Sequence, residues 1–304
     1  MNTKTGFITI VGRANVGKSS LLNVLTGEKI AAVSSKPQTT RTRITGIVTE
    51  GETQYVFMDT PGVHKARTKL GEHMNKAVRD SAAGVELILM MADVTKKIGE
   101  NETNIINSFH KNDNVILILN KIDLVKNKEE IAAKIAEYSS LYGFKAVIPI
   151  SVKENDGIDI VREEVKKYTV EGPHYFPDDK FTDQPEQTLV SEMIREKILQ
   201  LMFDEIPHGI AVTVEKMSER RTSSKEDILD IDAVIYCEKS SHKGMIIGKG
   251  GSMLKEIGGL ARADLENFFG IKVNLKLWVK VKEDWRNREF YIKDFGLSNT
   301  SSDK

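Results

Sequence analysis

Residues 12–19 read Gly12-Arg13-Ala14-Asn15-Val16-Gly17-Lys18-Ser19. In this octapeptide two glycines frame a loop that ends in Lys-Ser, a pattern that predicts phosphate binding when a strand precedes it and a helix follows. That context is expected here, because residues 7–11 form a short apolar run rich in β-formers and residues 18–26 have the pattern of a helix. The alternative is a glycine-containing turn that matches by chance, and the strand–loop–helix context argues against it.

Such a loop has a specific chemistry. Its backbone amides and the positive end of the following helix offer an anion site for phosphate oxygens. We expect Lys18 to reach the β- and γ-phosphates of a nucleotide and the Ser19 hydroxyl to bind Mg²⁺. The other residues expected to line the nucleotide in this segment are Gly12, Asn15, Val16, Gly17 and Ser20.

Around this loop, residues 1–170 read as alternating strands and helices. The alternation predicts βαβ crossovers and a mostly parallel sheet with helices on both faces. A short turn at residues 50–53 predicts one antiparallel hairpin at an edge. The expected strands are 7–11, 44–50, 55–59, 86–92, 115–120 and 146–150, and the expected helices are 18–26, 70–83, 101–111, 128–141 and 158–168.

The motif Asp59-Thr60-Pro61-Gly62 directly follows a predicted strand. A carboxylate at a strand end suits a Mg²⁺-linked water, and Gly62 leaves its amide free to approach a γ-phosphate. Taken alone, this tetrapeptide is often a simple turn. Its place at a strand end after the phosphate loop favours the functional interpretation.

Asn120-Lys121-Ile122-Asp123 ends another predicted strand, at the sheet edge where α/β proteins bind ligands. The Asp123 carboxylate can accept two hydrogen bonds from guanine, and adenine lacks both donors, so the motif selects GTP over ATP. Without the phosphate loop, a helix N-cap by Asp123 would be the better interpretation. We expect Ser151, Val152 and Lys153, after the next strand, to line the same base.

Residues 34–43 are polar and lack apolar periodicity, which predicts a loop. A threonine hydroxyl in this loop could complete the Mg²⁺ shell only when a γ-phosphate is present, which would make the loop a nucleotide-sensing switch. An ordinary polar loop is the alternative.

A second unit follows three prolines, Pro173, Pro177 and Pro185, in a stretch that reads as a linker. Its expected order is a helix (186–203), two strands (210–216 and 229–238), a glycine-rich turn opening a helix (250–269), a strand (272–281) and a final helix (284–294). We expect Gly258 and Gly259 to break the helix that Gly251 begins.

The turn in this unit contains Gly248-Lys249-Gly250-Gly251, which fits the Gly-x-x-Gly loop of KH modules. Two glycines let the backbone approach a nucleotide chain, Lys249 pairs with phosphate, and Lys255 follows on the helix. We expect Ile246 and Ile247 to form an apolar floor for unstacked bases. Any glycine-rich helix start would match the bare motif, and the neighbouring residues and element order strengthen it.

Charge in this region supports RNA binding. Residues 239–288 hold eleven Lys and Arg against five Asp and Glu, a net charge of +6. A solvated charged face is the alternative, since basic runs are common on surfaces. Trp278 shares strand parity with Lys276 and Lys280, and could stack on a base or pack beneath the terminal helix; packing is favoured.

Length, charge and cysteine content restrict the classes of protein to which the chain can belong. The chain has 304 residues and a formal net charge of zero, which fits two folded domains and argues against a uniformly basic protein. Its single cysteine, Cys237, excludes an intramolecular disulfide and fits a reducing compartment. The longest apolar run, residues 87–92, is far too short to span a membrane. A cytoplasmic protein is expected.

Together these segments resemble the Era/TrmE-like family of GTPases, and within it the members with a C-terminal KH domain. The resemblance covers nearly the whole chain and implies a P-loop GTPase domain over 1–172, a linker over 173–187 and an α+β prokaryotic-type KH domain over 188–304. It implies Thr40, with Thr39 as the fallback, as the switch threonine on Mg²⁺. Lys18, Thr40 and Gly62 are then the catalytic groups on GTP, with GDP as the product.

The resemblance also bears on the rate. Many related GTPases place a Gln after Asp-x-x-Gly to orient the attacking water, and Val63 stands there instead; His64 is more often a bystander. Asn15 resembles the asparagine by which relatives hold K⁺ against the phosphates. Slow intrinsic hydrolysis, stimulated by K⁺, is therefore expected.

The implied partner is the single-stranded 3′ end of the small-subunit (16S) ribosomal RNA, and the implied process is 30S subunit assembly and maturation. A monomer, with peripheral association at the inner face of the cell membrane, is also implied. The competing hypotheses are a regulatory module whose output is membrane or protein contact, a P-loop ATPase or kinase, and a tRNA-modifying relative. The last is disfavoured because those relatives carry the domain inside a larger chain that ends in a cysteine.

Overall fold

The computed structural model describes residues 3–36, 38–62, 68–70, 72–74, 84–203, 206–221 and 226–298. The chain forms two compact units. The first comprises Met1–Ile30, Thr40–Lys65 and Met74–Asp183, and the second comprises Ala31–Thr39, Ala66–His73 and Gln184–Lys304. Most of the helix expected over residues 70–83, together with Val63 and His64, lies outside the described residues.

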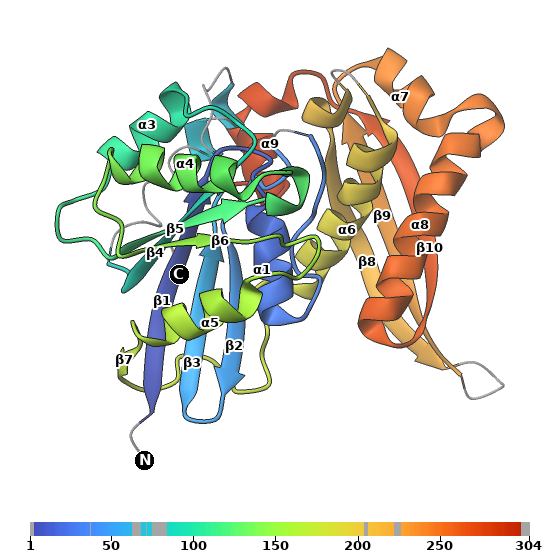
Figure 1. Cartoon of the computed structure of the whole chain (residues 1–304). Helices are drawn as coiled ribbons and strands as arrows, with labels where there is room; N and C mark the ends of the chain where they lie inside the picture. The colour runs from blue at the N-terminus through green and yellow to red at the C-terminus, as the bar shows by residue number, and fades with distance from the viewer. Residues whose placement is uncertain are drawn as a thin grey trace. The chain divides into compact units, whose positions relative to one another are not determined.

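The first unit is built on one sheet with the strand order β2-β3-β1-β4-β5-β6, in which β7 also pairs with β1 (Figure 1). The pairs from β3 through β1, β4 and β5 to β6 are parallel, and β2 pairs antiparallel with β3 at the edge, so the predicted parallel sheet with one edge hairpin is confirmed. Its elements are β1 (Lys4–Gly12), α1 (Lys18–Thr26), β2 (Ile44–Glu50), β3 (Thr53–Asp59), β4 (Leu87–Asp93), α3 (Glu100–Asn107), β5 (Val115–Asn120), η1 (Ile122–Leu124), α4 (Lys128–Ser139), β6 (Ala146–Pro149), α5 (Ile158–Lys166) and β7 (Val170–Glu171).

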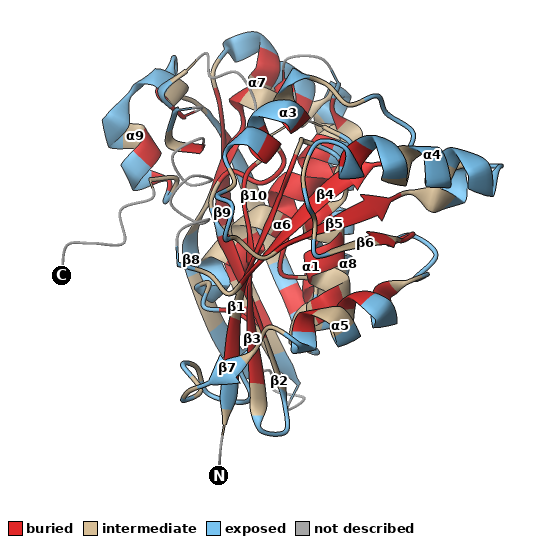
Figure 2. Ribbon diagram, turned by 60° about the vertical axis from the view of Figure 1, so that its left-hand side comes forward, coloured by how far each residue is buried: buried red, intermediate tan, exposed pale blue. Residues whose placement is uncertain are grey.

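The central strands are apolar because helices cover both faces of this sheet. Every residue of β4 and β5 is buried, and both strands are red in Figure 2. Ile106 of α3 and Tyr138 of α4 belong to one core cluster with Met90 of β4. On the remaining side, Arg162 of α5 donates hydrogen bonds to carbonyl oxygens at the end of α1. The near-continuous Val, Ile, Leu and Met runs follow from this two-sided burial.

Glycine permits the close packing of α1 on β2. A Cβ on Gly46 would lie 2.6 Å from side-chain atoms of both Leu22 and Thr26. The helix therefore packs tightly over the strand, which fixes α1 relative to the sheet.

The ends of the parallel strands gather the predicted motifs at one edge. β1 ends at Gly12, β3 at Asp59 and β5 at Asn120. Ile10 pairs with Asp59, and Asp93, at the end of β4, pairs with Asn120. Carboxyl ends of parallel strands form the ligand crevice of open α/β sheets, so the topology places these motifs side by side.

The second unit has a three-stranded sheet with the order β10-β9-β8. β9 runs parallel to β10 and antiparallel to β8, with an irregularity between Val214 and Lys216. Its elements are α6 (Glu186–Leu201), η2 (Ile206–Gly209), β8 (Ala211–Arg221), β9 (Asp227–Cys237), α7 (Ser240–Ile247), η3 (Lys249–Gly251), α8 (Ser252–Phe269), β10 (Lys272–Val281), η4 (Trp285–Asn287) and α9 (Glu289–Asp294).

Helices α6, α7 and α8 contribute to one apolar core with the strands. Ile198, Ile246 and Leu265 are fully buried members of it, one from each helix. The expected break at Gly258 and Gly259 is wrong, since α8 runs unbroken from Ser252 to Phe269. A Cβ on Gly258 would lie 3.5 Å from Leu277 Cδ1, an ordinary van der Waals contact, so the helix has room for a larger residue there.

Membrane-spanning length is not reached in the described parts of the chain: none of their helices is both long and apolar enough to cross a bilayer.

Candidate functional site

The loop between β1 and α1 has a backbone that its sequence explains. Gly12, Asn15 and Gly17 all have positive φ, at 154°, 65° and 106°. A Cβ on Gly17 would lie 2.3 Å from Asn120 Nδ2, so only glycine fits there. Asn15 is one of the few non-glycine types that tolerate the left-handed region. The loop thus closes directly onto the first turn of α1, where free amides favour an anion.

Lys18 is folded over this loop. Its side chain is buried, and Nζ donates hydrogen bonds to the carbonyl oxygens of Gly12 (3.2 Å) and Arg13 (3.0 Å). Burial lowers the pKa of Lys18, and the negative charge of Asp59 opposes that shift. An ammonium held in so dry a place gains from an anion beside it, which is what phosphate oxygens supply.

Three side-chain oxygens converge beside Lys18. Ser19 Oγ donates to Asp59 Oδ2 at 2.6 Å and lies 2.8 Å from Thr40 Oγ1. Thr40 Oγ1 also lies 3.3 Å from Asp59 Oδ2. Asp59 is fully buried, and its Oδ1 lacks a well-formed hydrogen bond among the described residues. Burial raises the pKa of Asp59, and Lys18 and the Ser19 hydrogen bond oppose the shift.

The neighbouring threonine points elsewhere. Thr39 Oγ1 donates to the carbonyl oxygen of Lys36 (2.6 Å) and lies 2.7 Å from Ser34 Oγ. Of the two threonines, Thr40 is therefore the one that reaches Ser19 and Asp59.

Gly62 lies against the phosphate loop. A Cβ on Gly62 would be 2.8 Å from both Cα and N of Ala14, so this approach excludes any larger residue. Thr60 anchors the segment by donating to the carbonyl oxygen of Ile10 (2.9 Å). The Asp59–Gly62 motif is thus fixed to the loop.

The third motif ties three segments together. Asn120 Nδ2 donates to the carbonyl oxygen of Val16 (2.8 Å), and Asn120 Oδ1 accepts from the amide of Val152 (3.0 Å). Ser151 Oγ donates to Asp123 Oδ1 at 2.7 Å and so orients that carboxylate. Asp123 itself is exposed, so its carboxylate is accessible to a ligand.

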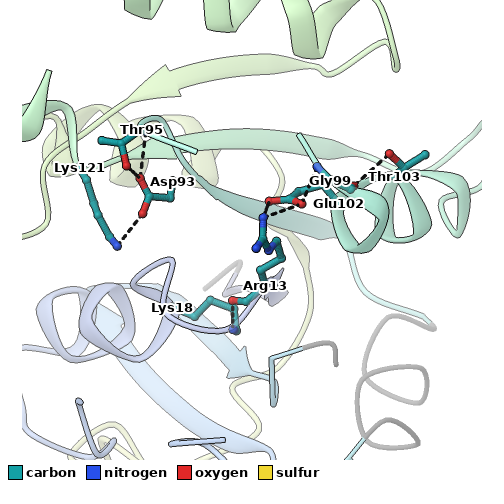
Figure 3. A network of polar contacts seen from close by, with 8 residues as sticks. All are labelled: Arg13, Lys18, Asp93, Thr95, Gly99, Glu102, Thr103 and Lys121. Carbon is teal, nitrogen blue, oxygen red and sulfur yellow. Dashed lines mark hydrogen bonds and ion pairs between the residues drawn. The ribbon is translucent and has the colours of Figure 1, made fainter. Parts of the chain in front are cut away.

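Two supporting interactions surround the loop (Figure 3), and the sequence analysis did not identify them. Lys121 Nζ donates to Asp93 Oδ2 (2.7 Å), whose other oxygen accepts from Thr95. Arg13 Nη1 pairs with Glu102 Oε1 at 2.9 Å, and Glu102 is buried. Asp93 could have been suspected from its position at a strand end beside Asn120. Glu102 gave no signal, because its partner lies 89 residues away.

In the second unit, the glycine-rich segment is a tight loop between two helices. Gly248, Gly250 and Gly251 have positive φ, at 73°, 60° and 82°. A Cβ on Gly248 would lie 2.8 Å from Met253, whereas Gly250 and Gly251 face open space. Lys249 and Lys255 are exposed. The loop thus offers a bare backbone and two ammonium groups at the start of α8.

Comparisons with known proteins match both units. The sequence family described as "50S ribosome-binding GTPase" matches residues 7–121, and the KH domain family matches residues 205–286. GTPase Era of Ruminiclostridium cellulolyticum is 48% identical over 303 residues, covering 99% of this chain and all of that protein. GTPase Era of Clostridioides difficile is 49% identical over 297 residues, covering 97% and 99% of the two chains.

The chain belongs to the Era family of GTPases. A solved structure of Era in complex with MgGDPNP and nucleotides 1506–1542 of 16S ribosomal RNA matches with a TM-score of 0.92 at 36% identity, over 97% of this chain and 99% of that one. A variant of Aquifex aeolicus Era bound to GDP·AlF₄⁻ matches with the same score and identity, over 97% and 100%.

Within this Era-family chain, two expectations for the RNA-binding unit are corrected. Ile246 is not part of an exposed floor for bases, because it is fully buried in the core, and Ile247 is half-buried. The reason is that both residues belong to α7, which turns one of them inward. Trp278 is not packed beneath the terminal helix, since 45% of it is exposed.

Proposed function

We propose that this Era-family GTPase is a GTP-driven switch whose KH unit binds the 3′ end region of small-subunit (16S) ribosomal RNA and which acts in 30S subunit assembly and maturation. The observation that carries the switch is the convergence of Ser19, Thr40 and Asp59 beside Lys18. The RNA partner is supported by the relative that was solved with 16S nucleotides and by the loop around Lys249.

The residues present fit Mg²⁺. Mg²⁺ is a hard cation that prefers oxygen ligands, and here two hydroxyls and a buried carboxylate meet. The available Asp59 Oδ1 and the raised pKa of Asp59 agree with a site that gains from a cation. Ser19 and Thr40 would hold the metal directly and Asp59 through water. The metal would neutralise charge on the phosphates when bound.

The side chains and backbone amides of the protein have separate roles in binding GTP. Lys18 holds the β- and γ-phosphates with its ammonium, and the Gly62 amide donates to the γ-phosphate. Thr40 contributes only while a γ-phosphate is present, which makes its segment sensitive to hydrolysis. Asp123, oriented by Ser151, accepts from guanine, and Asn120 holds the loops that shape the base site. Asn15 is the proposed K⁺ ligand.

RNA recognition falls to the loop of Gly248–Gly251 and the helix after it. Gly250 and Gly251 leave room for a nucleotide backbone, Lys249 and Lys255 pair with phosphates, and Ile247 contacts a base edge. A ribosomal RNA partner supports a cytoplasmic location, which belongs to the same proposal, with peripheral membrane association as a secondary part of it.

RNA affinity in three nucleotide states tests the proposal. An RNA with the sequence of 16S nucleotides 1506–1542 is titrated against the protein with GDPNP, with GDP and without nucleotide. We expect affinities that differ by about tenfold between states, a usual coupling strength. Equal affinities would overturn the switch. No binding in any state would overturn the RNA role and favour a membrane or protein partner.

The matched variants are Lys249→Ala and Lys128→Ala, since both lysines are exposed at helix starts and Lys128 lies in the other unit. Only the former should weaken RNA binding and lower its salt dependence.

A further inference from the structure

Three consecutive charged residues in the middle of α6 are buried. Arg195 and Glu196 are each 2% exposed, and Lys197 is 8% exposed. Burying charged groups costs free energy unless each is paired or hydrogen-bonded. Lys197 is paired with Asp264 of α8 and, at 3.5 Å, with its neighbour Glu196. Arg195 and Glu196 reach a different segment, Ala31–Thr39, which belongs to this unit although its sequence lies beside the phosphate loop.

Arg195 holds the end of that segment. Its guanidinium is fixed by Glu192, one turn earlier, with Nε donating to Oε1 at 2.8 Å and Nη2 to Oε2. From this fixed position Nη2 also donates to the carbonyl oxygen of Thr39. A bidentate carboxylate pair makes a guanidinium rigid, so the Thr39 carbonyl is held by a preoriented donor.

α6 holds the start of the segment as well. Glu196 Oε1 accepts from the amide of Val33 at 3.0 Å, and Gln200 Nε2 donates to the Val33 carbonyl oxygen at 3.2 Å. Between these two anchors, the Ser34 and Thr39 hydroxyls meet at 2.7 Å. α6 therefore forms hydrogen bonds with Val33 and Thr39, and the hydroxyl contact between Ser34 and Thr39 lies within the same segment.

One peptide bond joins this loop to the nucleotide site. The Thr39 carbonyl and the Thr40 nitrogen share a planar peptide group, so a donor that fixes the carbonyl also orients the start of Thr40. Thr40 belongs to the first unit, and its hydroxyl lies against Ser19 and Asp59. We infer that Arg195 is a positioning residue for the GTP-bound state, which acts through the Thr39–Thr40 peptide, and that Glu196 and Gln200 support it.

This inference rests on the proposed role of Thr40 as a Mg²⁺ ligand that is engaged only with GTP. It means that the RNA-binding unit contributes directly to nucleotide discrimination. Because such coupling is reciprocal, bound GTP stabilises the hydrogen bonds between α6 and the loop by the same free energy by which those hydrogen bonds stabilise bound GTP.

The experiment compares affinities for GDPNP and GDP, both with Mg²⁺. Arg195→Met keeps most of the unbranched stem but removes the guanidinium donors. It should weaken GDPNP binding about tenfold, the value of one charge-assisted hydrogen bond, and leave GDP binding within about twofold. Arg195→Lys should restore part of the loss. Lys197→Met removes the next buried cation, which pairs with Asp264 and has a longer contact, at 3.5 Å, with Glu196 Oε2, but none with the loop that is given for the described residues; it should lower the ratio far less than Arg195→Met.

Thr40→Ala separates the two proposals. If Thr40→Ala leaves the GDPNP-to-GDP ratio unchanged, the proposed Mg²⁺ role of Thr40 fails. If Thr40→Ala lowers the ratio and Arg195→Met does not, the positioning role of Arg195 is overturned. The double variant should lose no more than Thr40→Ala alone, because both changes act through one hydroxyl. Should Arg195→Met fail to fold, Arg195→Lys and Gln200→Ala, at an exposed residue, carry the same test with a smaller expected loss.

Discussion

The hydroxyl oxygens of Ser19 and Thr40 lie 2.8 Å apart, and both lie against the same carboxylate oxygen of Asp59. Ser19 is in the first turn of α1, whereas Thr40 follows a loop that α6 holds. The two hydroxyls therefore have different supports. Ser19 is held by a helix of the first unit, and Thr40 depends on a loop that belongs to the second unit.

Ser19→Ala is expected to weaken both GDP and GTP binding, because this hydroxyl faces the proposed Mg²⁺ position in both states. The expected loss is about tenfold or more in Mg²⁺ and much smaller in EDTA, since charge-assisted contacts to a bound ion are the strong ones. The measurement is nucleotide affinity by fluorescence with and without EDTA.

Ser19→Thr is the matched control for that change, as it keeps the hydroxyl and should restore Mg²⁺ dependence. A Ser19→Ala protein that still gains as much from Mg²⁺ as the original would show that Ser19 is not a ligand. The hydrolysis rate would be followed alongside, and we expect it to fall with affinity.

Asp123→Asn is expected to change the base preference. An amide cannot accept both guanine donors, so GTP affinity should drop by about tenfold to a hundredfold, the range seen when a buried polar pair is broken, and xanthine nucleotides should bind better than GTP. Competition between GTP and XTP measures this. Unchanged GTP use would remove Asp123 from the base site.

Ser151→Ala refines the same test, because the Ser151 hydroxyl donates to Asp123 Oδ1 at 2.7 Å and so acts through that carboxylate. It should weaken GTP binding by only a few-fold, in line with one neutral hydrogen bond, and should not improve XTP binding. A gain for XTP in this variant would contradict the assigned geometry.

Stability should depend on the charge of Asp93 at low pH. Burial raises the pKa of Asp93, but hydrogen bonds from Lys121 and Thr95 outweigh it and hold the pKa below its ordinary value. A carboxylate with a depressed folded-state pKa stabilises the fold above its unfolded pKa of about 3.9, and this contribution is lost as pH falls through the folded value. The free energy of unfolding of the Asp93→Asn variant should therefore differ most from that of the original protein near neutral pH.

Urea unfolding between about pH 6 and about pH 3 measures this difference, which should shrink below about pH 4. Asp179→Asn, at an exposed residue outside the network, should show no such trend. A gap between the original protein and Asp93→Asn that stayed constant down to the lowest pH would mean that the Lys121 pair is not what stabilises the loop.

The local sequence pattern predicted the parts of the fold in which a single periodicity of apolar residues dominates. The strands β2, β5 and β10 begin and end where the sequence predicts, because apolar runs or strict alternation mark them. The phosphate loop and the Asn120–Asp123 motif also lie where strand ends put them. In these cases the chemistry and the local structure come from the same few residues.

Other features depend on contacts that local pattern does not encode. Ile246 looked available for RNA, yet the pitch of α7 turns it into the core. Gly258 looked like a helix breaker, yet α8 continues through it to Phe269. Arg195 and Glu196 carried no signal in the sequence, because their partners are about 160 residues away along the chain. Pairing across such distances can be seen only in the folded chain.

Gly250→Asp should abolish most RNA binding through charge alone. Gly250 has a φ of 60° and faces open space, and both Asp and Asn tolerate that backbone, so Gly250→Asn supplies the same shape and strain without the charge. A carboxylate placed beside Lys249 repels the phosphates that Lys249 would pair with, and the loss should exceed about tenfold and grow at low salt. Gly250→Asn should lose only a few-fold. The measurement is the affinity of both variants for the 16S fragment at two salt concentrations. Equal losses in Gly250→Asp and Gly250→Asn would mean that loop shape, and not phosphate contact, governs binding. No loss in either variant would remove this loop from the RNA site.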